Sequence, residues 1–171
     1  MNYLKDKSAY LCGPIKNASD DGVGWREEIT PFLNELGVTV LDPCKKISKN
    51  SEIGEQKANF TELILQENWD KLKESFWPIV RHDLRSVDQS DFIIFNYDTD
   101  VQTVGSIHEL VVANFEKKII LLKYRKDQLS KFNPWLSIFV KSHMFFDEWY
   151  KMKDYLKNVN GGKIDSSYWV L

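Results

Sequence analysis

The sequence predicts an α/β fold in which helices cover a parallel β-sheet, and three observations lead to this class. Short apolar runs such as FIIFNY (92–97) and KIILLK (118–123) have the composition of strands buried on both faces. Between such runs lie longer stretches whose apolar residues recur at helical spacing. Three of the runs end in Gly-Pro, Asp-Pro or Asp-Thr-Asp, which favour a turn out of a strand.

The chain opens with a strand, a helix and a second strand. These are expected at residues 8–12 (SAYLC), 25–36 and 38–41 (VTVL). Gly37 is well placed to end the helix, because glycine readily adopts the left-handed conformation found there. Asp21 is a candidate N-cap, and Pro31 indicates a kink or a later start.

Residues 45–59 are polar and lack periodicity, so we expect an excursion from the core there. A helix is predicted over residues 60–76, with apolar side chains directed inward. These are Leu63, Ile64, Leu72 and Phe76. Trp77-Pro78 is expected to break this helix, because proline lacks a backbone N–H, and a second helical piece follows over residues 79–87.

The second half of the chain continues the alternation of strands and helices. We expect a strand at 92–97, a helix opening at Gly105, a strand at 118–123, a helix at 132–140, a strand at 143–146, and a helix that Asp147 caps and that runs through Leu156. The tail, residues 163–171, ends on apolar side chains and is expected to dock, with a slight preference for a neighbouring molecule.

This order implies five parallel strands with helices on both faces and right-handed crossovers. Among doubly wound folds it matches the flavodoxin-like version. No repeat, low-complexity run or linker interrupts the sequence, so residues 1–171 are expected to form a single domain.

Composition narrows the function classes. A formal net charge of −2 gives no electrostatic case for a nucleic-acid polymer, and no apolar run approaches the roughly 20 residues of a membrane span. The start, MNYLKDKSAY, lacks a secretory pattern, so we expect a cytoplasmic protein. Cys12 and Cys44 are expected to be buried or half-buried thiols in a reducing compartment rather than a disulfide framework or metal site. A nicotinamide cofactor or a P-loop phosphate site has no support, because both GxGxxG and GxxxxGK(S/T) are missing. Neither a metal nor a redox cofactor is indicated.

Glu109 is the first candidate for chemistry. It is expected in the first turn of a helix, just past the end of the 92–97 strand, and ligands bind at that edge of open α/β sheets. The helix dipole favours a negative charge there by roughly 0.3–1 kcal/mol, so Glu109 is expected to be ionised and able to act as a nucleophile or base. The alternative is structural, since Glu is common near helix starts.

Three loops, at residues 13–24, 42–46 and 98–109, should meet at this edge. The side chains expected to converge on one pocket are Tyr10, Asp83, Asp98, Asp100 and Glu109. A carboxylate nucleophile with a second carboxyl is the minimum for retaining glycosyl chemistry, in which the two groups stand roughly 5–5.5 Å apart. Tyr10 has a structural alternative, because it alternates with core residues on an early strand.

Four motifs occur in order: YLCGPI, HDL, DxSDFIIFNYD, and GSIHELxxA followed by KKIILL. Together they resemble the nucleoside 2-deoxyribosyltransferase family over residues 10–122. The resemblance implies a covalent 2-deoxyribosyl intermediate on Glu109, with Asp83 handling the proton of the nucleobase and Tyr10 orienting the nucleophile. It also implies a base pocket lined by Gly13, Pro14 and Ile15, and assembly into dimers or larger homo-oligomers. The expected partners are a nucleoside or nucleotide and a free nucleobase.

One departure from the family pattern concerns the substrate. Transferases of this family often place Asp six residues before the nucleophile, where this chain has Thr103. The related nucleoside 5′-monophosphate N-glycosidases have a serine there, and a hydroxyl tolerates a phosphate better than a carboxylate does. Gly105 and Ser106 at the helix start could help to hold a phosphate, whereas Asp98 and Asp100 supply opposing negative charge. The sequence therefore favours a transferase, with a monophosphate N-glycosidase or a catalytically silent nucleotide-binding module as alternatives.

Overall fold

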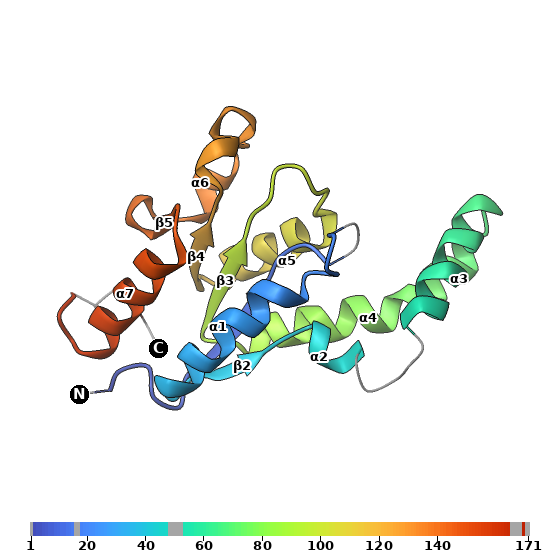
Figure 1. Ribbon diagram of the computed structural model, residues 1–171. Helices are drawn as coiled ribbons and strands as arrows, with labels where there is room; N and C mark the ends of the chain where they lie inside the picture. The colour runs from blue at the N-terminus through green and yellow to red at the C-terminus, as the bar shows by residue number, and fades with distance from the viewer. Residues whose placement is uncertain (1, 16–17, 48–52, 165–168, 170–171) are drawn as a thin grey trace.

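Five parallel strands form one sheet in the order β2-β1-β3-β4-β5 (Figure 1). The computed structural model describes residues 2–15, 18–47, 53–164 and 169. The strands are β1 Ser8–Cys12, β2 Thr39–Leu41, β3 Phe92–Asn96, β4 Ile119–Lys123 and β5 Phe145–Phe146. This order is that of the flavodoxin-like doubly wound fold, as the sequence predicts.

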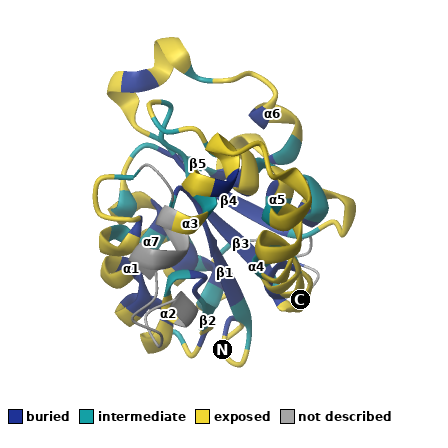
Figure 2. Ribbon diagram, turned by 90° about the vertical axis from the view of Figure 1, so that its right-hand side faces the viewer, coloured by how far each residue is buried: buried dark blue, intermediate teal, exposed yellow. Residues whose placement is uncertain are grey.

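Helices lie on both faces of this sheet (Figure 2). The described helices are α1 Val23–Glu35, α2 Cys44–Ile47, α3 Ile53–Leu65, α4 Trp69–Gln89, α5 Val104–Phe115, α6 Leu136–Phe139 and α7 Trp149–Asn160, with 3-10 turns η1 Lys126–Lys131 and η2 Ser142–Met144. Helices α1 and α7 cover one face, and α4 and α5 cover the other. The C-terminal ends of β1, β3 and β4 are therefore held between two helical layers.

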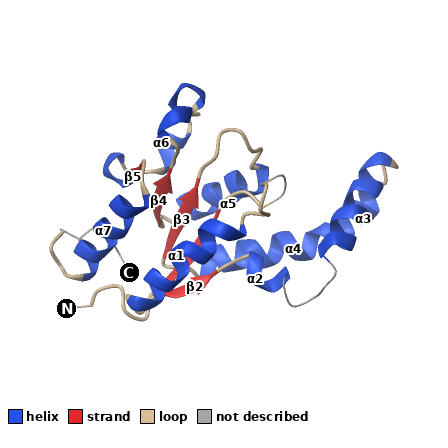
Figure 3. Ribbon diagram, in the orientation of Figure 1, coloured by secondary structure: helices blue, strands red, loops and turns tan. Residues whose placement is uncertain are grey.

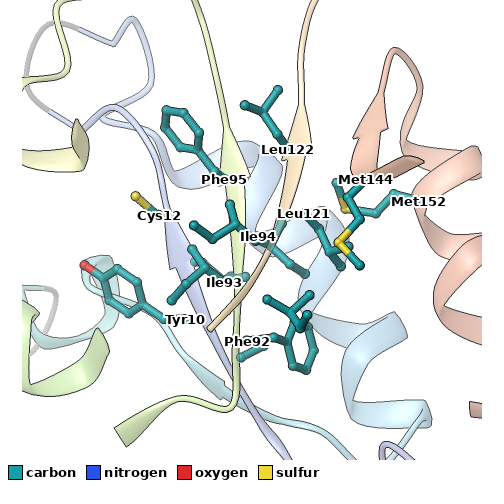
Figure 4. Packing of buried hydrophobic residues seen from close by; sticks show 14 of the residues in the cluster. Tyr10, Cys12, Phe92, Ile93, Ile94, Phe95, Leu121, Leu122, Met144 and Met152 are labelled. Atoms are coloured by element: carbon teal, nitrogen blue, oxygen red, sulfur yellow. The ribbon is translucent and has the colours of Figure 1, made fainter. Parts of the chain in front are cut away.

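The core is centred on β1, β3 and β4 (Figure 4). Phe92, Ile93, Ile94 and Phe95 are all buried, which explains why this strand reads as a continuous apolar run. Each such side chain contributes about 1.5–3 kcal/mol on burial. The strand nearest the candidate chemistry is thus fixed on both faces.

Proline does not break α4, contrary to the expectation from Trp77-Pro78. The helix runs without interruption through Pro78, and the break comes earlier, at the turn that Asn68 closes by accepting a hydrogen bond from the Lys71 N–H (3.3 Å). Glu67 adopts a positive φ of 54° in this turn. Glu74, whose carbonyl loses its partner at Pro78, lies on an exposed part of the helix where water can bond it.

Helix α1 also differs at its start and contains Pro31 in its interior. Asp20, rather than the expected Asp21, accepts hydrogen bonds from the N–H groups of Gly22 and Gly24 (2.9 and 2.8 Å). Gly22 has a φ of 73°, and a Cβ there would collide with the Pro14 carbonyl oxygen. Only glycine therefore fits this turn.

The described parts of residues 45–59 belong to the helices α2 and α3, although the sequence shows no periodicity there. Helix α3 and the N-terminal part of α4 form an arm that extends from the sheet (Figures 1 and 3). Leu63 is buried and Leu72 half-buried, but Ile64 and Phe76 are largely exposed rather than inward-facing. Too little of the domain lies beside this arm to bury both of its faces. Residues 48–52 lie outside the described residues.

The C-terminal elements are shorter than expected. Residues 142–144 form η2, which leaves only Phe145–Phe146 as β5, and the expected helix at 132–140 is reduced to α6. Asp147 does not cap α7, since its carboxylate binds Lys151 (2.6 Å). Trp169 is buried against its own domain, beside Phe92 and Tyr155, which corrects the preference for a neighbour at this residue. Tyr168, Val170 and Leu171 lie outside the described residues.

A buried guanidinium connects the two loops that follow β1 and β2. The Arg26 side chain is fully buried and donates hydrogen bonds to the backbone carbonyls of Leu11, Gly13, Pro14 and Gly22 (2.6–3.4 Å). Its Nε also lies 3.6 Å from the buried Asp42 carboxylate, at the end of β2. One side chain thus fixes the loops that follow β1 and β2.

Replacing Arg26 with methionine should destabilise the protein strongly. The Asp42 carboxylate would stay buried without its partner, and breaking such a pair costs about 3–5 kcal/mol. Urea unfolding measures the change. The matched control is Lys153→Ala, which removes a surface ion pair with Glu28 and should cost below about 1 kcal/mol. Equal, small losses in the two variants would contradict the assigned role of Arg26.

Candidate active site

The Glu109 carboxylate is held between two donors from β1. Its Oε1 accepts a hydrogen bond from the Tyr10 hydroxyl and its Oε2 one from the Cys12 thiol, both at 3.0 Å. Side chains two residues apart on a strand point to the same face, so both donors reach α5. Glu109 lies in the second turn of α5, not the first as expected.

Asp83 on α4 approaches the same group. Its side chain is only 19% exposed, and its charge raises the pKa values of both Glu109 and Tyr10. The imidazole Nδ1 of His82 lies 3.8 Å from its carboxylate. Tyr10 on β1 and Glu109 on α5 are therefore in contact, and Asp83 on α4 lies close enough for its charge to act on both.

Burial raises the pKa of Glu109 from its ordinary 4.5 to about 7. Asp83 acts in the same direction, whereas the hydrogen bonds from Cys12 and Tyr10 and the charge of Arg26 lower the pKa. The expectation that the helix dipole keeps Glu109 ionised is wrong, because a rise of this size corresponds to roughly 3 kcal/mol and outweighs a dipole effect of about 0.3–1 kcal/mol. Near neutral pH, protonated and ionised forms coexist.

The two donors stay protonated. Burial raises the pKa values of the Tyr10 hydroxyl and the Cys12 thiol well above their ordinary values, and the charge of Glu109 raises them further. The sequence prediction did not place Cys12 in the site. Its position two residues after Tyr10, on the same face of the same strand, is the signal that could have found it.

The turn after β1 packs closely against the end of β3. Gly13 and Pro14 are buried and Ile15 is half-buried. A Cβ on Gly13 would lie 3.0 Å from both the Asn96 carbonyl oxygen and Trp25 Cζ2, so a larger residue would push these groups apart. The Trp25 ring stacks on Trp149 of α7 (5.6 Å between centroids). The lining role expected for these turn residues remains a prediction.

Asp98 and Asp100 are bound to η1 and its neighbours. The side-chain Nε2 of Gln128 donates hydrogen bonds to Asp98 Oδ1 (3.1 Å) and Asp100 Oδ2 (2.7 Å). Its side-chain Oε1 accepts a hydrogen bond from the Thr99 N–H (3.2 Å). Lys131 pairs with Asp100 (2.6 Å) and Arg125 with Asp98 (3.8 Å). The two ion pairs balance the negative charge of the loop. The expected convergence of Asp98 and Asp100 on the Glu109 pocket remains a prediction.

The start of α5 carries the remaining predicted residues. Thr103 is the N-cap residue, but its side chain makes no capping hydrogen bond. Gly105 is exposed with open space where a Cβ would be, and Ser106 is buried. A ligand could reach the first backbone N–H groups of the helix at this exposed end.

Among residues 2–15, 18–47, 53–164 and 169, no group of three or more His, Cys, Asp or Glu could hold a metal ion. None of the described helices is both long and apolar enough to cross a membrane.

Solved structures with this fold include two deoxyribosyltransferases. The chain is similar to the 2-deoxyribosyltransferase of Bacillus psychrosaccharolyticus, with a TM-score of 0.63 and 17% identity over 86% of this chain and 91% of that one. It is also similar to the 2-desoxiribosyltransferase of Leishmania mexicana, with a TM-score of 0.58 and 15% identity over 88% and 97%. No protein-family model and no curated protein sequence matches the chain. At these identities the likeness establishes the fold.

Replacing Glu109 with glutamine should stabilise the protein in a pH-dependent way. A carboxyl whose pKa is raised by folding does not change the free energy of unfolding well below pH 4.5, where it is protonated in both states. It lowers that free energy most above its folded pKa of about 7. The variant should therefore gain up to about 3 kcal/mol over the wild type at pH 8 and little at pH 5. Urea unfolding at both pH values measures it, and a pH-independent difference would contradict a raised pKa.

Proposed function

We propose that the protein is a nucleoside 2-deoxyribosyltransferase, which moves the sugar of a 2′-deoxynucleoside from one nucleobase to another. The observation that carries this proposal is the Glu109 carboxylate, held by Tyr10 and Cys12 beside Asp83 at the C-terminal edge of the sheet. The motif resemblance and the likeness to two deoxyribosyltransferase structures support it.

In the first step, an ionised Glu109 oxygen attacks the anomeric carbon of the sugar. The N-glycosidic bond breaks, its electron pair passes to the base nitrogen, and the Asp83 carboxyl donates a proton to the departing base. In the second step, a nitrogen of the incoming base attacks the same carbon, its proton passes to Asp83, and Glu109 leaves as a carboxylate. These steps require the two carboxyls to hold one proton between them, and that proton must be on Asp83 when Glu109 attacks.

The environment of Glu109 suits a group that must both attack and leave. Burial reduces the solvation of the carboxylate, which favours attack on the sugar. The two hydrogen bonds stabilise the negative charge that returns when the sugar departs. Each carboxylate oxygen accepts more than one hydrogen bond, so both donors can stay in place while one oxygen reacts.

Hydrolysis of a nucleoside 5′-monophosphate is the second candidate function. It is favoured by the loop between β3 and α5, where Arg125 and Lys131 balance the charges of Asp98 and Asp100 and the Gln128 amide donates a hydrogen bond to both carboxylates. Thr103 then leaves the start of α5 without a carboxylate that would repel a phosphate. The same covalent intermediate on Glu109 would react with water instead of a second base.

Product analysis by chromatography tests the proposal directly. Each 2′-deoxynucleoside and its 5′-monophosphate is incubated with the protein, with and without a second free base. A new nucleoside that forms only with the acceptor base is the expected result, and Glu109→Ala should abolish it. Free base released from the monophosphate without exchange would favour the hydrolase, and unchanged activity of Glu109→Ala would exclude the covalent route.

The two functions also differ in their response to charge at Thr103. If a monophosphate binds at the start of α5, Thr103→Asp should lower kcat/KM for it by about tenfold or more through like-charge repulsion, whereas Thr103→Asn should have a smaller effect. Asparagine has the shape of aspartate without its charge, so their comparison isolates repulsion. Equal kcat/KM values for the two variants would count against phosphate binding there.

A further inference from the structure

The Cys12 thiol has two acceptors and only one hydrogen. Its Sγ lies 3.0 Å from Glu109 Oε2 and 3.6 Å from the Ser106 backbone carbonyl oxygen. The side chain is fully buried at the C-terminal end of β1. A buried thiol usually behaves as a small apolar side chain, and the short approach to a carboxylate sets this one apart.

We propose that Cys12 is a positioning residue for Glu109, whose thiol donates a hydrogen bond that orients the carboxylate and favours its ionised form. Its importance for catalysis rests on the proposed function, whereas the interaction itself can be tested without a substrate.

The arrangement of the donors supports this role. Tyr10 and Cys12 extend from the same face of β1 and bond different oxygens of one carboxylate. A single donor would let the carboxylate turn about its terminal bond, where rotation is soft, but two donors on a rigid central strand fix its plane. An attacking oxygen is thereby held in one direction, which is the main requirement for reaction in a bound complex.

The Ser106 backbone carbonyl oxygen is a second acceptor for the thiol hydrogen of Cys12. When Glu109 is protonated or carries the sugar, Oε2 is a weaker acceptor than in the carboxylate, and the thiol can turn to the Ser106 carbonyl oxygen. The hydrogen bond to Glu109 is thus strongest in the ionised state. A donor of this kind stabilises the carboxylate more than the ester, so it aids release of the sugar in the second step.

Other groups also act on the Glu109 charge. Asp83 on α4 opposes ionisation, whereas Arg26 on α1 and the Tyr10 hydroxyl on β1 favour it. Burial, the largest cause of the raised pKa of Glu109, also depends on the volume of the side chain at Cys12. The comparison of alanine with serine at this position therefore separates loss of the donor from loss of volume.

A packing role for Cys12 makes a different prediction. If the thiol only fills space, Cys12→Ala and Cys12→Ser should change the unfolding midpoint but leave the titration of Glu109 where it is. If it acts as a donor, Ala and Ser should differ, because only serine keeps a hydrogen to donate.

Carbon NMR titration of the Glu109 carboxyl, without substrate, tests the proposal in four proteins: wild type, Cys12→Ala, Cys12→Ser and the control Cys44→Ala. The wild type should titrate near pH 7. Cys12→Ala should titrate about one pH unit higher, as expected for losing a hydrogen bond to a charged group, while Cys12→Ser should remain close to the wild type. Cys44 has no hydrogen bond to Glu109 in the described structure, so its variant should match the wild type. A Cys12→Ala titration equal to the wild type would overturn the proposal.

Two further measurements test the same proposal. Should Cys12→Ala fail to fold, the S–H stretching band of the wild type serves instead: it should shift as Glu109 titrates and stay constant in Glu109→Gln, and a band constant in both would overturn the proposal. In an active protein, the acid limb of the kcat pH profile should move with the NMR titration in Cys12→Ala. A wild type inactive on every nucleoside and monophosphate would remove the proposed function, while the titration would still decide whether Cys12 positions Glu109.

Discussion

The buried Arg26 guanidinium is the constraint on which the rest of the site depends. A charge without solvent is costly unless it is paired and hydrogen-bonded, and here four backbone carbonyls and Asp42 satisfy it. Its partners belong to the end of β1, the Gly22 turn and the end of β2, so three segments that would otherwise move independently share one centre. The end of β1 is fixed as a result, and with it the directions of Tyr10 and Cys12.

At Glu109, desolvation competes with hydrogen bonding. Loss of water disfavours the charged form, while Tyr10 and Cys12 favour it, and the balance leaves a pKa of about 7. A more exposed carboxylate would be fully ionised but well solvated and therefore less reactive. A carboxylate buried without donors would stay protonated. The two hydrogen bonds from β1 place this group between those extremes, and Asp83 adds a second carboxyl that can carry the proton.

Local sequence patterns were sufficient for the strands β1 to β4, but not for the full extent of β5 or for every helix. The continuous apolar run of β3 predicts a buried strand because burial on both faces leaves no alternation. Pro78 does not end α4, since the affected turn is exposed and water can replace the lost hydrogen bond, and no local pattern records that exposure. In the site, Tyr10 and Glu109 could be found from motifs and sheet topology. The pKa of Glu109 could not, because it depends on how closely α4, α5 and β1 pack, and Cys12 was assigned to the core for the same reason.

In the proposed mechanism, Glu109 becomes covalently bonded to the sugar. Mass spectrometry of the protein after incubation with a 2′-deoxynucleoside, without any acceptor base, tests it most directly. The account predicts a mass increase of one deoxyribosyl group on a peptide containing Glu109, which disappears when a free base is added and does not form in Glu109→Gln. Release of the base by the wild type with no adduct, matched by the same rate of release in Glu109→Gln, would contradict it.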